Sequence, residues 1–172
     1  MGSDALTDTR FVGYRRKLIE DIRNHGVQDL ETLQIFDQVP RHIFLPEGVW
    51  PRAYEDAPIP IGYSQTASQP SLQAYYLSLL KPVATEKVLE IGTGSGYLTA
   101  LLALIVERVY SVERVRELSK RARKALDLLG VQNVALLSRG RDNRMEEVRA
   151  VRRDCGVSCI PVYSPGTRRS VG

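Results

Sequence analysis

The amino-acid sequence predicts an open α/β sheet of Rossmann type preceded by helices. The main observation is an alternation of short apolar runs with helical patterns over residues 87–137, which indicates parallel strands joined by crossover helices. A turn with three glycines, residues 92–96, follows the first apolar run, at the place where such sheets bind ligands. Residues 8–38 add helical periodicity upstream of the sheet.

Two amphipathic helices are expected before the sheet. Residues 8–24 carry apolar side chains at helical spacing, and Gly26 supplies a C-terminal cap. Asp29 can cap a second helix over residues 30–38, which Pro40 ends.

The segment that follows is predicted to be irregular. Residues 46–70 contain five prolines and two glycines, which disfavours regular structure, and a loop of this length in a compact domain is usually functional. A short helix is expected at residues 71–80, where apolar side chains again follow helical spacing.

The sheet region has three expected strands with two helices between them. Strands are predicted at residues 87–91, 108–112 and 133–137, because short apolar runs are typical of strands buried on both faces. The connecting helices are predicted at residues 97–106 and 115–129.

Composition is that of a soluble globular protein, with 43% hydrophobic and 26% charged residues. No apolar run is long enough to span a membrane, and the first ten residues lack a signal pattern, so a cytoplasmic protein is expected. The net charge of +4 comes from residues 138–172, because residues 1–137 hold 16 basic and 16 acidic residues. The body lacks a basic stripe interleaved with aromatics, and nucleic-acid binding is therefore not expected.

The glycine turn (residues 92–96) favours a ligand that approaches the backbone closely. Without Cβ atoms, Gly92, Gly94 and Gly96 can adopt positive φ and leave room for that ligand. A dinucleotide fingerprint would need glycine or alanine where Tyr97 stands, so NAD is disfavoured.

Two acidic residues favour S-adenosyl-methionine as the ligand. Glu113 ends the second strand, where its carboxylate can accept hydrogen bonds from both ribose hydroxyls. Glu90 lies near the end of the first strand, close to where a cationic sulfonium group could lie. The alternative is a generic βα turn with Glu113 on the surface. The predicted cofactor-binding residues are Glu90, Gly92, Thr93, Gly94, Ser95, Gly96 and Glu113.

Several segments together resemble the protein-L-isoaspartate O-methyltransferase family. "VLEIGTGSGYLTALLA" and "VYSVERVRELSKRAR" are similar to its cofactor half, and "VPRHIFLPEGVWPRAYEDAPIPIGYSQTASQPS" to its substrate region, so the resemblance covers about residues 11–137. Many methyltransferases share the cofactor motif, and its pairing with "SQTASQP" makes the resemblance specific. It implies a class I methyltransferase that methylates the carboxylate of isoaspartyl and D-aspartyl residues in damaged proteins, initiating their repair.

The resemblance also implies the reaction site. Ser68 corresponds to the active-site serine, Thr66 is its hydroxyl neighbour, and Gln65 is expected to shape the substrate pocket. The substrate carboxylate is already ionised at neutral pH, so the site must align it with the methyl group, and hydroxyls can hold its second oxygen. Family members usually have glycine where Ser64 stands. The alternative is a polar turn in which Ser68 or Ser71 caps the next helix.

No metal site is predicted. Neither His25 nor His42 has a second ligand at metal-binding spacing, and both are expected to be surface or packing residues. Cys155 and Cys159 form a C-x₃-C pair without further ligands. Trp50 is expected to be a packing anchor.

The pattern stops after Leu137. A family member would continue with an acidic residue between glycines that contacts adenine, and then a hydrophobic strand. Here the sequence reads "SRGRDNRMEEVRAVRRDCGVSCIPVYSPGTRRSVG", in which Asp142 aligns poorly with that acid and "GVSCIPVY" could form a short strand.

A shift of reading frame near Ser138 would explain the break. With suitable codons, reading "SRGRDNRMEE" one nucleotide later gives "AGDGTTGWRRY". The tryptophan in it does not depend on codon choice, because the methionine codon ATG of Met145 is followed by the G that begins every codon for Glu146, and the shifted frame reads TGG. The following "VRAVRRDCGV" gives "YGPYDAIVV", which supplies the missing strand. We therefore expect a frameshifted or truncated chain without its later strands, with an interior strand left as a sheet edge. The coding DNA tests this expectation.

Three segments of one domain follow from these observations. Residues 1–86 hold the N-terminal helices and substrate-recognition loop, residues 87–137 the cofactor-binding βαβαβ unit, and residues 138–172 an aberrant basic tail that is a candidate for disorder. The expected partners are isoaspartyl-containing proteins and peptides, bound by a monomer. Two alternatives stay open, namely a methyltransferase for small molecules or RNA, and a non-catalytic module that keeps cofactor binding.

Overall fold

The computed structural model describes residues 6, 8–138 and 158–160. Two helices precede the sheet, α1 (Val12–Asn24) after a 3₁₀ turn η1 (Thr9–Phe11), and α2 (Leu30–Gln38). Both predicted helices are present, although the first turn of the helix predicted over residues 8–24 is the 3₁₀ turn η1. Asp29 caps α2 by accepting a hydrogen bond from the Thr32 amide at 2.9 Å.

The region predicted to be irregular contains more structure than expected. It holds the 3₁₀ helix η3 (Glu47–Arg52) after η2 (Arg41–Phe44), and an antiparallel hairpin of β1 (Ile59–Gly62) and β2 (Gln65–Ala67). Ile59 and Ile61 are buried while the residues between and after them are exposed, so a two-residue alternation was hidden among the prolines. The prediction of irregular structure over residues 46–70 is wrong in this respect. Helix α3 (Pro70–Leu80) follows the hairpin.

All strands of the main sheet run parallel. They are β3 (Lys87–Ile91), β4 (Arg108–Glu113), β5 (Val134–Ser138) and β6 (Ser158–Ile160), in the spatial order β5-β4-β3-β6. The first three match the predicted strands to within one residue, and the crossover helices are α4 (Tyr97–Ala103) and α5 (Arg116–Leu128). Strand order reverses at β3, because β4 and β5 lie on one side of it and β6 on the other. The glycine turn therefore follows the strand at the switch point.

Strand β6 lies within "GVSCIPVY", the segment named as a possible short strand. It pairs with Val88–Glu90 of β3, so β3 is an interior strand over these residues rather than the exposed edge that was expected. Ser138 ends β5, and the rest of the tail, including Asp142 and Cys155, lies outside the described residues.

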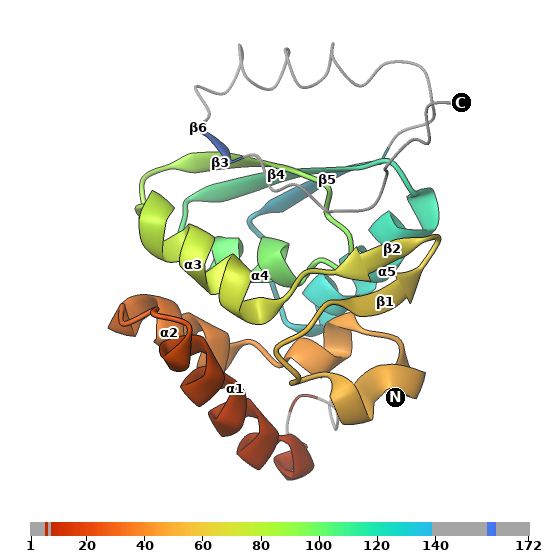
Figure 1. Ribbon diagram of the computed structural model, residues 1–172. Coiled ribbons are helices and arrows are strands. Elements are labelled where there is room, and N and C mark those ends of the chain that lie inside the picture. Colours follow the sequence, from red (N-terminus) through yellow and green to blue (C-terminus); the bar gives the residue numbers. More distant parts are fainter. Residues whose placement is uncertain (1–5, 7, 139–157, 161–172) are drawn as a thin grey trace, which may run out of the picture.

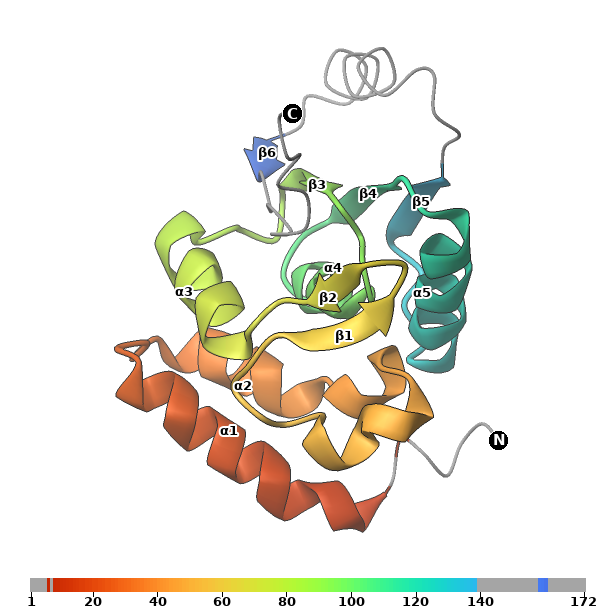
Figure 2. The same cartoon turned by 45° about the vertical axis from the view of Figure 1, so that its right-hand side comes forward.

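The helices lie in layers below the sheet. Helices α3, α4 and α5 cover one face, and α1 and α2 form a further layer beyond them (Figures 1 and 2). One buried cluster joins these layers, with Phe36 of α2 edge-on to Tyr97 of α4. Leu89 and Val112 form a second buried cluster in the sheet. Among the described residues, none of the helices has the length and apolarity that a membrane crossing needs.

Candidate functional site

All three glycines of the turn have positive φ, 98° at Gly92, 55° at Gly94 and 88° at Gly96. They differ in what surrounds them. A Cβ atom on Gly94 would meet nothing closer than 3.8 Å, whereas on Gly96 it would lie 2.8 Å from Cβ of Ala122 in α5. Gly96 therefore allows α4 to pack on α5, a reason that the sequence analysis did not consider, and Gly94 keeps the open backbone that a ligand needs.

Glu113 connects the end of β4 to the glycine turn. Its Oε2 accepts a hydrogen bond from the Gly94 amide at 2.8 Å, and its Oε1 accepts one from the Val115 amide at 2.7 Å. The side chain is buried, which contradicts the alternative of a surface glutamate beside a generic turn. An ionised carboxylate has about four acceptor sites, so two remain for other donors.

Glu90 is a buried carboxyl group among hydroxyls. Its Oε2 accepts hydrogen bonds from Thr99 Oγ1 at 2.6 Å and from Ser111 Oγ at 2.5 Å, and Ser111 also contacts Thr93. Burial raises the pKa of Glu90 to about 7, although these hydrogen bonds oppose the rise, and the charge of Glu113 adds to it. A cation placed beside Glu90 would favour its ionised form.

A small cavity brings the glycine turn and the segment "SQTASQ" (residues 64–69) together. Thr66 and Ser68 line it from the hairpin side, and Glu90 and residues 92–95 line it from the sheet side. Its volume of about 20 Å³ is that of roughly one water molecule, so only a small chemical group fits between the two motifs. Gln65 does not line this cavity, and its side chain donates to the Ser64 carbonyl instead.

The backbone of Ser68 is held by Arg41, a residue that the sequence analysis missed. Arg41 is fully buried, and its Nη2 donates to the Ser68 carbonyl at 3.0 Å. Its Nη1 donates to the carbonyls of Ala53 and Glu55 at 3.0 and 3.1 Å, and its guanidinium lies over the Tyr97 ring. A basic residue between the apolar residues of "VPRHIF" is the only sequence signal of this role.

Asp56 holds the next residues of the same segment. It accepts hydrogen bonds from the Ser71 amide at 2.8 Å and from the Gln69 side chain at 3.0 Å. Burial raises the pKa of Asp56, but these hydrogen bonds outweigh burial and lower it overall. The alternative in which Ser68 or Ser71 caps the next helix is wrong, because the N-cap residue of α3 is Gln69 and its side chain makes no cap hydrogen bond.

The two motif hydroxyls are not used to build the fold. Within the described part of the chain, neither Thr66 Oγ1 nor Ser68 Oγ makes a hydrogen bond, although the Ser68 carbonyl does. Both hydroxyls are therefore available to a ligand in the cavity.

The hairpin tip explains the departure at Ser64. Tyr63 and Ser64 have φ of 56° and 55°, the left-handed values of a two-residue hairpin turn. Glycine adopts this conformation without steric cost, which accounts for the glycine usual in the family.

The histidines and Trp50 are packing or surface residues, as expected. His42 is buried, stacks on Phe11 and lies 2.8 Å from the Tyr54 hydroxyl, while His25 is exposed. Trp50 Nε1 donates to the Leu45 carbonyl. Within the described residues, no group of three or more histidine, cysteine or acidic side chains could hold a metal ion.

Comparisons with known proteins identify the family. The profile of the protein-L-isoaspartate(D-aspartate) O-methyltransferase family matches residues 14–144. Proteins named protein-L-isoaspartate O-methyltransferase from Dictyoglomus turgidum and Geobacter metallireducens are 49% identical over 122 and 121 residues, which are 70% of this chain and 56% of each relative. The chain thus spans about half the length of the curated relatives it matches.

Solved structures agree with this result. A protein-L-isoaspartate O-methyltransferase superposes with a TM-score of 0.63 at 30% identity, covering 72% of this chain and 41% of that one. A Plasmodium falciparum beta-aspartate methyltransferase in complex with S-adenosyl-L-homocysteine has the same fold, with a TM-score of 0.65 at 24% identity over 78% of this chain and 68% of that one. The chain belongs to the protein-L-isoaspartate(D-aspartate) O-methyltransferase family.

Proposed function

We propose that this chain transfers a methyl group from S-adenosyl-methionine to the carboxylate of isoaspartyl and D-aspartyl residues in damaged proteins, the step that initiates their repair. The observation that carries the proposal is the cavity in which Thr66 and Ser68 face the glycine turn and Glu90. The names of the related proteins support the same reaction.

The residues present fit S-adenosyl-methionine. The free acceptor sites of Glu113 suit the ribose hydroxyls, and the open backbone at Gly94 allows a nucleoside to approach. Glu90 supplies a carboxyl group that becomes anionic next to a cation. When bound, the cofactor supplies an electrophilic methyl group on a positive sulfur.

The chain's own contribution is alignment rather than acid–base catalysis. A substrate carboxylate with a pKa of about 4 is already ionised, so it needs no base. The hydroxyls of Thr66 and Ser68 can donate to one carboxylate oxygen and turn the other toward the methyl group. The cavity has room for about one water molecule, and a site with so little water strengthens both hydrogen bonds.

Transfer of a tritiated methyl group to an isoaspartyl peptide tests the proposal. We expect labelling of this peptide, no labelling of the same peptide with normal aspartate, and strong loss of turnover in Ser68→Ala and Thr66→Ala with cofactor binding retained. Labelling of RNA or small molecules instead would support the alternative methyltransferase. Cofactor binding by calorimetry without transfer to any substrate would support the non-catalytic module.

The finer assignments belong to the same proposal. Residues 1–86 would recognise substrate, with Gln65 at the hairpin shaping the approach to the cavity, and residues 87–137 would bind the cofactor. Because one chain supplies both motifs of the cavity, we propose that the protein acts as a monomer, in the cytoplasm. Sedimentation with and without cofactor tests the oligomeric state.

A further inference from the structure

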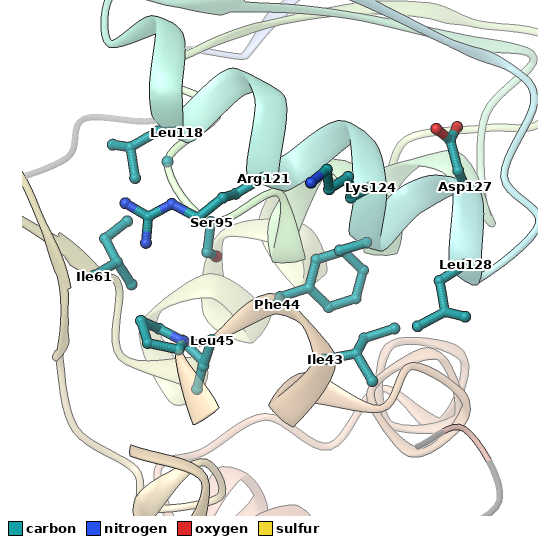
Figure 3. Close-up of a pocket in the computed structure, with 13 residues that line it drawn as sticks. Ile43, Phe44, Leu45, Ile61, Ser95, Leu118, Arg121, Lys124, Asp127 and Leu128 are labelled. Atoms are coloured by element: carbon teal, nitrogen blue, oxygen red, sulfur yellow. The ribbon is translucent and has the colours of Figure 1, made fainter. Parts of the chain in front are cut away.

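A larger groove lies beside the small cavity, between η2 and α5 (Figure 3). Its volume is about 590 Å³, and apolar side chains such as Ile43, Leu118 and Leu128 form most of its wall. Arg121 and Lys124 of α5 add two positive charges to this wall, and Asp127, which pairs with Arg123, adds one negative charge. A groove with an apolar wall and cationic rim is suited to a ligand that carries both apolar and anionic groups.

One end of the groove adjoins the proposed reaction site. Gly94 and Ser95 line both the groove and the small cavity. Ile61 closes this end from β1, the strand whose neighbour β2 carries Thr66. A polypeptide whose modified residue occupies the small cavity could therefore continue into the groove.

The charges at the groove are not neutralised within the described residues. None of the ion pairs among the described residues involves Arg121 or Lys124. The neighbouring carboxylate of Asp127 pairs with Arg123 instead. The Arg121 guanidinium lies 5.3 Å from the centre of the exposed Tyr63 ring and extends toward Ile61 (Figure 3). Two cations thus lie along the path away from the reaction site.

Helix α5 is basic as a whole. It carries five basic and two acidic side chains, which the neutral count over residues 1–137 conceals. Only Arg121 and Lys124 among these basic residues line the groove, whereas Arg116, Lys120 and Arg123 lie outside it.

We propose that the groove binds the polypeptide that flanks the isoaspartyl residue, and that Arg121 and Lys124 select flanks with acidic side chains. This inference rests on the proposed function. A polypeptide fits better than a nucleic acid, because the wall is mainly aliphatic and its aromatic lining residue, Phe44, is buried. The exposed Tyr63 ring beside the groove already has the Arg121 guanidinium over it. Each carboxylate beside an exposed cation strengthens binding by about 1.7- to threefold, so two together give roughly three- to tenfold.

Two isoaspartyl peptides that differ only in two flanking positions, glutamate or glutamine, test the inference. We expect the parent protein to have a KM about three- to tenfold lower for the acidic peptide, with equal kcat, and this preference to disappear at high salt. The double variant Arg121→Gln/Lys124→Gln should show equal KM for both peptides. Lys124→Gln alone, which leaves the Tyr63 contact intact, should lose part of the preference.

The matched control is Arg116→Gln/Lys120→Gln, which removes the same charge from the same helix but not from the groove. It should keep the preference, and equal loss in both double variants would overturn the inference in favour of a diffuse charge effect. Equal KM values in the parent protein would also overturn it, as would an RNA 20-mer that displaces the fluorescein-labelled acidic peptide at lower concentration than the unlabelled peptide does.

Direct binding separates the two proposals. Anisotropy of the labelled peptides measures the groove without any methyl transfer. Groove-dependent binding of the acidic peptide without transfer would refute the proposed function and keep the groove assignment. Transfer without a charge preference would refute the groove assignment alone, and the absence of both binding and transfer would refute both.

Discussion

Replacing Gly96 by alanine tests whether the glycine turn is fixed by helix packing. The added Cβ would lie 2.8 Å from Cβ and 3.2 Å from Cα of Ala122, at a residue whose φ is 88°. Both obstacles belong to α5, and the Cα atom of a packed helix cannot move as the end of a flexible side chain does. The substitution therefore forces α4 away from α5 or strains the turn.

Two costs can be estimated from this geometry. A left-handed φ costs an alanine about 1–2 kcal/mol, and overpacking of a close contact costs about 1–3 kcal/mol, which together give about 2–5 kcal/mol. Gly130→Ala carries only the first cost, because Gly130 has φ of 78° and no atom within 4 Å of the added Cβ. Gly13→Ala, in the open on α1, should be neutral or stabilise by up to about 1 kcal/mol.

Urea unfolding measures the three variants on one scale, with the slope of unfolding free energy against urea checked for constancy. We expect the order Gly13→Ala, Gly130→Ala, Gly96→Ala from most to least stable. Ala122→Gly should cost about 1 kcal/mol in the parent protein, because glycine weakens a helix, and clearly less in the background of Gly96→Ala, because there it also removes the 2.8 Å contact. A Gly96→Ala protein no less stable than Gly130→Ala, or an equal cost of Ala122→Gly in both backgrounds, would refute the packing explanation.

Three further substitutions have directions that follow from the structure. Ser64→Gly should stabilise the protein by about 1 kcal/mol in thermal melts, because it relieves a left-handed residue at the hairpin tip, and a lower Tm would contradict that conformation. Arg41→Met should destabilise it by about 3–5 kcal/mol in urea, because the backbone carbonyls of Ala53, Glu55 and Ser68 lose a charged donor. Exposed Arg52→Met should leave the urea midpoint unchanged, and equal midpoints for the two variants would oppose this role of Arg41. Because burial raises the pKa of Glu90 from 4.5 to about 7, the folded state holds this proton more tightly than the unfolded chain. Stability should therefore fall by up to about 3 kcal/mol as the pH rises through this range, and Glu90→Gln should remove that fall in urea titrations at several pH values; an unchanged pH profile would contradict the shift.

The parallel sheet could be predicted because its determinants are local. Strands buried on both faces are short apolar runs, and the prediction of residues 87–91 matches β3. The rule that parallel strands end at one edge then placed Glu113 beside the glycine turn, where it bonds the Gly94 amide.

The support of the SQTASQ segment could not be predicted because it depends on contacts far apart in the chain. Arg41 reaches carbonyls 12, 14 and 27 residues away, and Asp56 reaches an amide 15 residues away. No periodicity records such pairs, and the hairpin was hidden among the prolines in and around it. The roles of Thr66 and Ser68 came from the family resemblance, since hydroxyls in a polar segment are otherwise typical of turns.

These distant contacts also explain how a site without a strong base could work. Methyl transfer between an ionised carboxylate and a reactive cation depends on alignment, so the hydroxyls must be placed accurately and yet stay free to bind substrate. The structure meets both needs by holding the segment through its backbone. Arg41 bonds the Ser68 carbonyl and Asp56 bonds the Ser71 amide, while the hydroxyls of Thr66 and Ser68 make no bonds within the described residues. If the side chains themselves anchored the segment, substrate binding would have to break those bonds first, and part of the binding energy would be lost to that exchange.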